Sequence, residues 1–241
     1  MLKRSRQQDA SGDKDAEAFY DRKTHGFPGL QKSVEERLLH IRSALSVIEG
    51  NLYEVGGGKF IYITSCDHGE GKTITAIALA LGLAENDRQV LLIDSNSQNP
   101  SVHTCFQTPI SPGLSFLDHD EIVTNSLVRK TIYANLSIMP LGYLPDNQHT
   151  ATSQVMHLKN SGLLEQYDFV VVDGHSVLNS SHASLVAKQF DGLILVVQCE
   201  RTKKQVISQV TKKIHQADGR LLGVVLNRRK FYIPKFLYDR I

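Results

Sequence analysis

The sequence predicts an α/β protein with a mostly parallel central sheet flanked by helices, and three observations predict this fold class. Several strand-like segments are apolar at consecutive positions, such as Val-Leu-Leu-Ile at 90–93 and Phe-Val-Val-Val at 169–172. Strands buried on both faces have this pattern, which is typical of parallel sheets covered by helices on each side. These segments alternate with stretches of helical periodicity. A glycine-containing turn also joins one strand directly to a helix.

The elements follow in order along the chain. Residues 1–32 are mainly charged and small polar residues, and we expect a flexible N-terminal leader there. From Ser33 to Ile48 apolar residues recur at helical spacing, and Ser33 with Glu36 is a candidate capping box. Prolines make residues 95–135 rich in loops. Strands are predicted at 60–64, 89–94, 136–141, 169–173, 192–198 and 221–226, and helices at 73–85, 152–165, 181–189 and 202–217.

Composition limits the class of protein. The chain has 241 residues with 41% hydrophobic content, which suits one α/β domain with a flexible extension or two small domains. We place one P-loop domain at 33–230. A net charge of only +2 gives no bulk electrostatic reason to expect nucleic-acid binding. Three widely separated cysteines, Cys66, Cys105 and Cys199, argue against a disulfide framework or a zinc site and fit a reducing cytoplasm. The longest nearly apolar stretch, 74–84, is too short to span a bilayer.

Residues 59–73 form a strand, a loop and the start of a helix. Gly69 and Gly71 let the backbone approach a ligand closely and adopt positive φ. Lys72 adds a mobile positive charge, and Thr73 adds a hydroxyl suited to Mg²⁺. Cys66 stands where the G-x-x-x-x-G-K-[ST] motif has its first glycine, so an ordinary strand-to-helix turn is the alternative. The strand and the helix on either side favour a P-loop that binds a nucleoside triphosphate.

Two acidic residues end predicted core strands. Asp94 follows Val-Leu-Leu-Ile, and Asp173 follows Phe-Val-Val-Val. Ligands of open α/β sheets gather at the carboxyl ends of the strands. A carboxylate there, beside a P-loop, can hold Mg²⁺ directly or through water. The structural alternative is that each acid caps the next helix.

Four blocks of sequence together carry a family resemblance. In order they are Gly-Glu-Gly-Lys-Thr, Leu-Leu-Ile-Asp-Ser-Asn-Ser-Gln-Asn-Pro, Tyr-Asp-Phe-Val-Val-Val-Asp and Gly-Val-Val-Leu-Asn. This order resembles the MinD/ParA-type P-loop ATPases. Within them it is most similar to the bacterial tyrosine kinases (BY-kinases, CpsD/CapB type) of capsule and exopolysaccharide assembly, over about residues 33–230.

The resemblance implies ATP or ADP and Mg²⁺ as cofactors and assigns roles to matching positions. Lys72 would contact the β- and γ-phosphates, and Thr73, Asp94 and Asp173 would hold the metal. Asp94 would also be the acid nearest the attacking nucleophile, which makes Lys72 and Asp94 the catalytic candidates. Asn227 would recognise adenine. The nucleotide-binding candidates are His68, Gly69, Glu70, Gly71, Lys72, Thr73, Ile74 and Asn227.

The chain departs from the family pattern at several places. Asn96 and Gln98 replace the second acid and the arginine after Asp94, and Gly174-His175-Ser176 replaces Thr-Pro-Pro. In the Glu-x-x-Arg-x-x-Arg segment that helps subunits pack into rings, Leu39 takes the middle arginine position. The basic, aromatic tail at 231–241 offers two phosphorylation candidates, Tyr232 and Tyr238.

The resemblance implies a cytoplasmic tyrosine autokinase or ATPase that regulates polysaccharide assembly and export. Its expected partner is a membrane-anchored co-polymerase, or chain-length regulator, which would hold it at the inner face of the cell membrane. A homo-oligomer and a membrane contact through the tail are further expected interactions. Two alternatives stay open: a catalytically weak or inactive nucleotide-dependent switch, and a MinD/ParA-like positioning ATPase.

Overall fold

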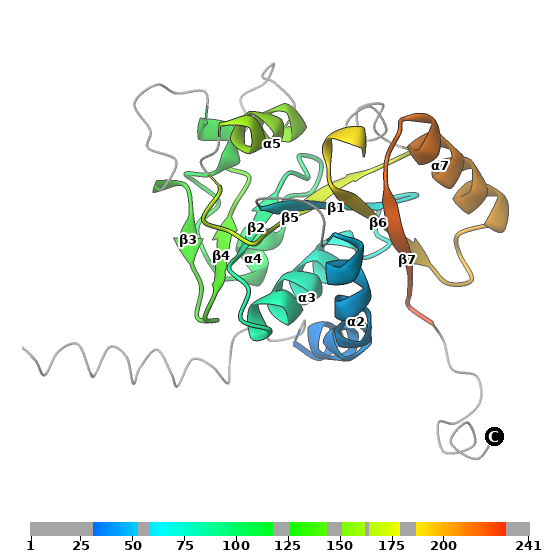
Figure 1. The fold of residues 1–241 in the computed structure, drawn as a ribbon, viewed down its shortest axis with the longest axis horizontal. Coiled ribbons are helices and arrows are strands. Elements are labelled where there is room, and N and C mark those ends of the chain that lie inside the picture. Colours follow the sequence, from blue (N-terminus) through cyan, green and yellow to red (C-terminus); the bar gives the residue numbers. More distant parts are fainter. Residues whose placement is uncertain are drawn as a thin grey trace, which may run out of the picture.

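The computed structural model describes residues 31–52, 58–117, 126–143, 151–161, 164–178 and 187–229. Its centre is a seven-stranded sheet of order β3-β4-β2-β5-β1-β6-β7 (Figure 1). Neighbouring strands are parallel except β3 and β4, which pair antiparallel. The strands are β1 (Lys59–Ser65), β2 (Val90–Asp94), β3 (Arg129–Lys130), β4 (Leu136–Met139), β5 (Phe169–Ser176), β6 (Gly192–Gln198) and β7 (Leu221–Asn227). The helices are α2 (Gln31–Asn51), α3 (Lys72–Glu85), α4 (Val102–Cys105), α5 (Ala151–Asn160) and α7 (Lys204–Gln216), with 3-10 turns at Leu114–Phe116 and Ala187–Gln189.

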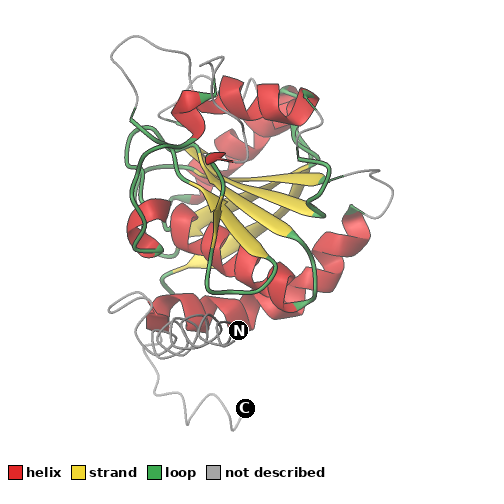
Figure 2. Cartoon of the chain, turned by 90° about the vertical axis from the view of Figure 1, so that its left-hand side faces the viewer, coloured by secondary structure: helices red, strands yellow, loops and turns green. Residues whose placement is uncertain are grey.

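Helices cover both faces of the sheet (Figures 1 and 2). On one face, Ile61 and Ile63 of β1 pack in a core with α2 and α3. On the other face, Phe60 and Tyr62 of the same strand pack in a second core with α5 and α7. Because both faces of a central strand are buried, apolar residues follow one another along most of its length, and this confirms the fold class predicted from consecutive apolar residues.

Helix α3 lies between the sheet and α2. Its central residues, from Thr75 to Ala84, are all buried. Close packing between the two helices is possible at Gly82, where an added Cβ would lie 3.2 Å from Leu45 Cδ1 and 3.4 Å from Leu38 Cδ1. Glycine at position 82 therefore lets α2 pack closely against α3, the helix that begins with the P-loop lysine.

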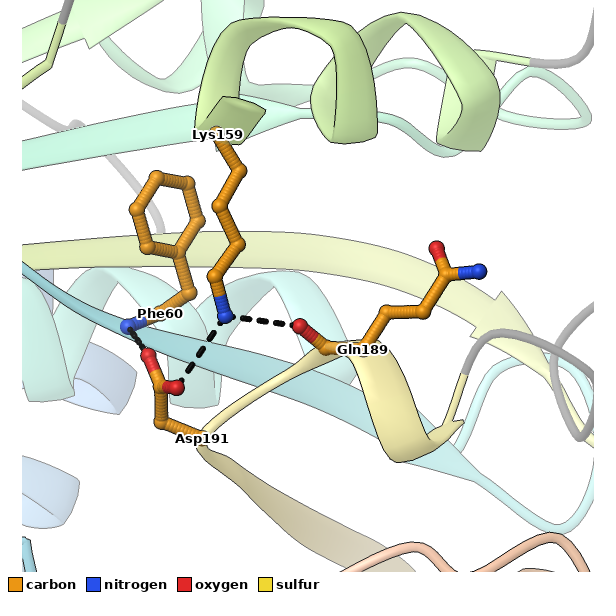
Figure 3. A network of polar contacts seen from close by, with 4 residues as sticks. All are labelled: Phe60, Lys159, Gln189 and Asp191. Carbon is orange, nitrogen blue, oxygen red and sulfur yellow. Dashed lines mark hydrogen bonds and ion pairs between the residues drawn. The ribbon is translucent and has the colours of Figure 1, made fainter. Parts of the chain in front are cut away.

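A polar network joins three elements at the amino-terminal edge of the sheet, opposite the P-loop (Figure 3). The Lys159 ammonium of α5 donates to the Gln189 carbonyl at 2.7 Å and pairs with Asp191 at 3.0 Å. The second oxygen of Asp191 accepts from the Phe60 N–H at 2.7 Å. Lys159 also lies 5.1 Å from the centre of the Phe60 ring. These contacts fix α5 against the start of β1.

Several predicted boundaries were wrong. The helix expected at 152–165 ends at Asn160, and β5 continues past 173 to Ser176. Residues 95–135 contain helix α4 and strand β3, which the sequence did not predict. Helix α2 begins at Gln31, before the predicted cap at Ser33. Most of the helix expected at 181–189 lies outside the described residues, as do most of the leader and all of the tail.

Among the described residues, no helix combines the length and the apolar composition needed to cross a bilayer.

Candidate nucleotide-binding site

Strands β2, β5 and β1 are neighbours in the sheet. The P-loop follows β1, Asp94 is the last residue of β2, and Asp173 lies near the carboxyl end of β5. Asp94 and Asp173 are register partners across β2 and β5, and Asp173 is the partner of Ile63 in β1. The sheet order therefore brings together three segments that lie far apart in the sequence. This edge is where ligands of open α/β sheets bind.

The P-loop backbone has the conformation that its glycines predict. Gly69 has φ of 70° and Gly71 has φ of 99°, both in the left-handed region that glycine adopts without strain. Gly71 is the N-cap of α3, so the first N–H groups of that helix and its positive dipole end face the loop. Cys66, at the position of the missing first glycine, is buried, and burial raises the pKa of its thiol to about 12.

Lys72 and Thr73 begin α3 and point toward buried polar groups. The Lys72 ammonium is 6% exposed and donates to Ser65 Oγ at 3.2 Å. The Thr73 hydroxyl donates to Asp173 Oδ2 at 2.6 Å, and it receives a hydrogen bond from Ser101 Oγ at 3.2 Å. The structure thus joins the predicted metal-binding hydroxyl to one of the predicted metal-binding carboxylates.

Asp173 has the oxygen atom best suited to a cation. Its side chain is fully buried, and Oδ1 has no hydrogen-bond partner among the described residues. A buried carboxylate oxygen without a partner is costly. Mg²⁺ uses one or two carboxylates together with substrate phosphates, so the donors present fit this ion. No cluster of three His, Cys, Asp or Glu side chains that could hold a metal occurs in the described part of the chain.

Asp94 is held differently. Its Oδ1 accepts from the Asn96 N–H at 3.1 Å, while Oδ2 accepts from the N–H groups of Ser101 at 2.9 Å and Val102 at 3.0 Å. Asp94 therefore accepts from backbone N–H groups at the start of α4, as the alternative of a helix-capping acid predicts. The two acids consequently differ, because both oxygens of Asp94 accept from backbone donors, whereas Oδ1 of Asp173 has no partner among the described residues.

Burial dominates the electrostatics of the two acids. It raises the pKa of Asp173, and the neighbouring charge of Asp94 raises it further. It also raises the pKa of Asp94, although the three backbone donors oppose that shift. Burial lowers the pKa of Lys72, which the Asp173 charge opposes. A divalent cation between these groups would favour the charged form of both carboxyls.

The remaining nucleotide-binding candidates lie around the loop. Glu70 is 2% exposed, and its carboxylate accepts from the Asp67 N–H at 3.0 Å and from the Thr202 hydroxyl. Its carbonyl accepts from Nδ2 of Asn227, so β7 contacts the P-loop. His68 is exposed on the loop, and Ile74 packs in the first turn of α3 against the core.

Ser101 and Arg37 were not predicted to belong to this site, whereas His175 stands in the block that departs from the family pattern. Ser101 reaches Thr73 from the loop after β2, and Arg37 of α2 donates to Asn227 Oδ1 at 2.6 Å. His175 is 7% exposed, and its Nε2 accepts from the Ser97 N–H at 3.2 Å. Their roles depend on tertiary contacts, which no local motif encodes. Tyr232, Tyr238 and the side chains of Ser33, Glu36 and Leu39 lie outside the described residues.

Comparison with known proteins agrees with this geometry. The AAA domain family matches residues 58–224. The tyrosine-protein kinase YwqD of Bacillus subtilis (strain 168) is 28% identical over 173 residues, which is 71% of this chain and 73% of that protein. Among solved structures, the kinase domain of VpsO is 27% identical with a TM-score of 0.69, covering 83% of this chain and 100% of that one. The chimerical protein CapA2B2 is 27% identical with a TM-score of 0.68, covering 79% and 84% respectively.

The family match spans the P-loop, Asp94 and Asp173. The chain therefore belongs to the AAA domain family, and within it is similar to bacterial tyrosine kinases, as its sequence motifs indicated.

Proposed function

We propose that this chain binds Mg·ATP at the P-loop and transfers the γ-phosphoryl group to a tyrosine hydroxyl. The supporting observation is the hydroxyl–carboxylate pair of Thr73 and Asp173, whose buried Oδ1 has no described partner, at the N-terminus of α3. Its relatives YwqD and VpsO are named as kinases, which favours transfer to protein over simple hydrolysis.

Each residue has a proposed task. Lys72 and the amides of the P-loop bind the β- and γ-phosphates. Thr73 and Asp173 hold Mg²⁺, which neutralises charge on the transferring group when it is bound. A tyrosine hydroxyl has a pKa near 10 and needs a proton acceptor close by. Asp94 is the proposed acceptor, because its Oδ1 accepts one backbone hydrogen bond and keeps a second lone pair for the tyrosine proton.

The pathway and partners are also proposals. The relatives and the sequence motifs favour a role in capsule or exopolysaccharide assembly, beside a membrane-anchored chain-length regulator at the inner face of the cell membrane.

The basic tail is a candidate contact with lipid. Sedimentation with anionic vesicles, with and without ATP, tests this contact. Binding that depends on ATP would instead favour a MinD/ParA-like positioning role.

Mass spectrometry tests the activity. After incubation with Mg·ATP, we expect ADP release and phosphate on Tyr232 or Tyr238. Lys72→Ala should abolish both and weaken ATP binding, because the variant loses the ammonium that contacts the phosphates. Lys212→Ala, on the exposed side of α7, is the matched control and should behave as the wild type. Unchanged ATP affinity in Lys72→Ala would contradict the site.

One observation favours a second function, a nucleotide-dependent switch without turnover. Asn96 stands at the position of the family's second acid and is 7% exposed, with its amide directed to the Asn99 carbonyl at 3.4 Å. It therefore stabilises its own loop and adds no charge to the site. ATP binding with neither ADP release nor tail phosphorylation would support the switch. Asn96→Asp would then be expected to gain activity.

A further inference from the structure

Glu70, in the middle of the P-loop, is buried and held by residues outside the loop. It is 2% exposed, although it lies between two glycines of positive φ, Gly69 and Gly71. Its Oε2 accepts from the Asp67 N–H at 3.0 Å, which closes the loop on itself, and its Oε1 accepts from the hydroxyl of Thr202. Glycines leave the backbone free to take many conformations. The contacts of Glu70 therefore restrict a loop that its glycines alone would leave flexible.

Thr202 belongs to a tight turn, residues 198–202, that follows β6. Its N–H donates to the Gln198 carbonyl at 3.0 Å, and its Oγ1 accepts from the Gln198 N–H at 3.1 Å. Because the oxygen accepts within the turn, the hydroxyl proton is left to donate to Glu70. Gln198 is the last residue of β6, which pairs with β1, the strand that leads into the P-loop. The sheet thus fixes the turn that contacts Glu70.

The backbone of Glu70 is held from a second element. Its carbonyl accepts from Nδ2 of Asn227, the last residue of β7. Strands β6 and β7 are adjacent and parallel, and Gln198 is the register partner of Asn227. The ends of two neighbouring strands therefore both contact Glu70, one through its side chain and the other through its carbonyl.

The charge of Glu70 argues against direct contact between its side chain and phosphate. A carboxylate repels a polyphosphate, whereas the amides of the loop and the ammonium of Lys72 attract it. Both carboxylate oxygens also accept hydrogen bonds from protein groups already. The side chain of Glu70 therefore contributes to the shape of the loop rather than to the binding of phosphate.

We propose that Thr202 is a positioning residue of the nucleotide site: through Glu70, it holds the P-loop in the conformation that binds the triphosphate. The proposal rests on the proposed nucleotide-binding function and goes beyond it, because Thr202 is 132 positions from Glu70 and lies in none of the sequence motifs. A loop that already has its bound conformation loses less conformational freedom on binding, so its affinity is higher. By reciprocity, a bound triphosphate should stabilise the turn at 198–202.

Calorimetry on the full chain, with Mg·ATP and with tripolyphosphate, tests the proposal. Thr202→Val keeps the shape of the side chain but removes the hydroxyl, so the affinity for both ligands should fall about tenfold. Thr202→Ser keeps the hydroxyl and should bind within about twofold of the wild type. Thr211→Val is the matched control and should bind as the wild type, because the Thr211 hydroxyl donates to the Ile207 carbonyl of its own helix, α7, at 2.9 Å.

A second background shows whether the effect passes through Glu70. In Glu70→Ala, the hydroxyl of Thr202 has lost its carboxylate partner. Adding Thr202→Val to this variant should then change the tripolyphosphate affinity by less than about twofold, whatever Glu70→Ala does by itself. A further tenfold loss would show that Thr202 does not act through Glu70, and the proposal would be wrong.

Hydrogen exchange gives a readout on the wild type, which needs no variant to fold. Tripolyphosphate should slow the exchange of amides in the turn at 198–202 as well as in the P-loop. Unchanged exchange in the turn, or unchanged affinity in Thr202→Val, would overturn the inference and leave the nucleotide site intact. A wild type that binds neither Mg·ATP nor tripolyphosphate would instead contradict the nucleotide site, and the inference with it.

Discussion

The hydroxyl of Thr73 has a defined share of its hydrogen-bonding capacity left for a metal. It donates its proton to Asp173, and Ser101 occupies one of its two lone pairs. One lone pair remains on Oγ1 of Thr73, the atom that donates a hydrogen bond to the buried carboxylate of Asp173. A threonine with a purely structural role would not need to link Ser101 to Asp173 through its hydroxyl.

Replacement of Thr73 tests its proposed contact with Mg²⁺. Thr73→Val keeps the shape of the side chain but removes the oxygen, so affinity for Mg·ATP should fall about 10–100-fold. Affinity for ATP in the presence of EDTA should change little, and Thr73→Ser should retain the metal dependence. Calorimetry with and without Mg²⁺ measures both quantities. An equal loss with and without metal would contradict the assignment.

Asp173 should give the nucleotide-free protein an unusual pH dependence. Its pKa is raised in the folded state, chiefly by burial, and that of Asp94 is raised as well. The folded protein then binds more protons than the unfolded chain above pH ~4. The stability from these carboxyls is full below that value and is lost as the pH rises through the raised folded pKa values. Denaturant unfolding from pH 4 to 8 should record this fall, and Asp173→Asn should reduce it. A flat profile in the wild type would contradict the shift.

At the scale of elements, the contact of β1 with β5 accounts for one departure from the family pattern. A Cβ on Gly174 would lie 2.0 Å from Cζ of Tyr62, whose ring fills the space where a side chain would stand. The Tyr62 hydroxyl accepts from the His175 N–H at 2.9 Å, two residues after Asp173, the proposed metal ligand. The tyrosine in β1 therefore requires a glycine at this position of β5, because its ring occupies the space of a side chain there.

Gly174→Ala should therefore destabilise the fold by about 1–3 kcal/mol, because β5 and β1 cannot separate without losing their pairing. Gly223→Ala, in β7 of the same sheet, is the control, since nothing lies within 4 Å of its added Cβ. Denaturant midpoints of the two variants measure the difference. Equal midpoints would show that Tyr62 moves aside at little cost.

Element boundaries were predictable only where local signals agreed. The helix at 152–165 was drawn too long because apolar residues continue after it, although Asn160 and Ser161 are residues that disfavour helix interiors. Strand β5 extends to Ser176 because that residue pairs with Ser65 of β1, which its own sequence cannot reveal. Strand β3 is an Arg-Lys pair that, among the described strands, pairs with β4 alone, and it has no hydrophobic pattern to detect.

At the scale of the whole molecule, stability should fall from the centre of the sheet toward its edges. Strands β1 and β5 are paired on both sides and are almost wholly buried, whereas β7 is an edge strand with Val224 44% and Leu226 67% exposed. Amide protons that are buried and paired on both sides open only with much of the fold.

Hydrogen exchange tests this gradient. We expect the slowest exchange in β1 and β5 and faster exchange in β7 and β3. Added Mg·ATP should slow exchange in the P-loop and the first turn of α3, while the Lys159 network at the opposite edge should change little. Exchange in β7 as slow as in β1 would contradict the proposed gradient.

The sequence by itself determined the fold class, the P-loop and the two strand-end acids. Periodicity, glycine positions and the residues that end apolar runs are local properties, so they can be identified in the sequence without knowledge of tertiary contacts. Only the tertiary structure decided that both oxygens of Asp94 accept from backbone N–H groups while Asp173 keeps an oxygen without a described partner. The tertiary structure also showed that Arg37 donates to Asn227, although the two residues are 190 positions apart in the sequence. Hydrogen-bond saturation and long-range contact depend on how the whole chain packs, and therefore no stretch of sequence can specify them alone.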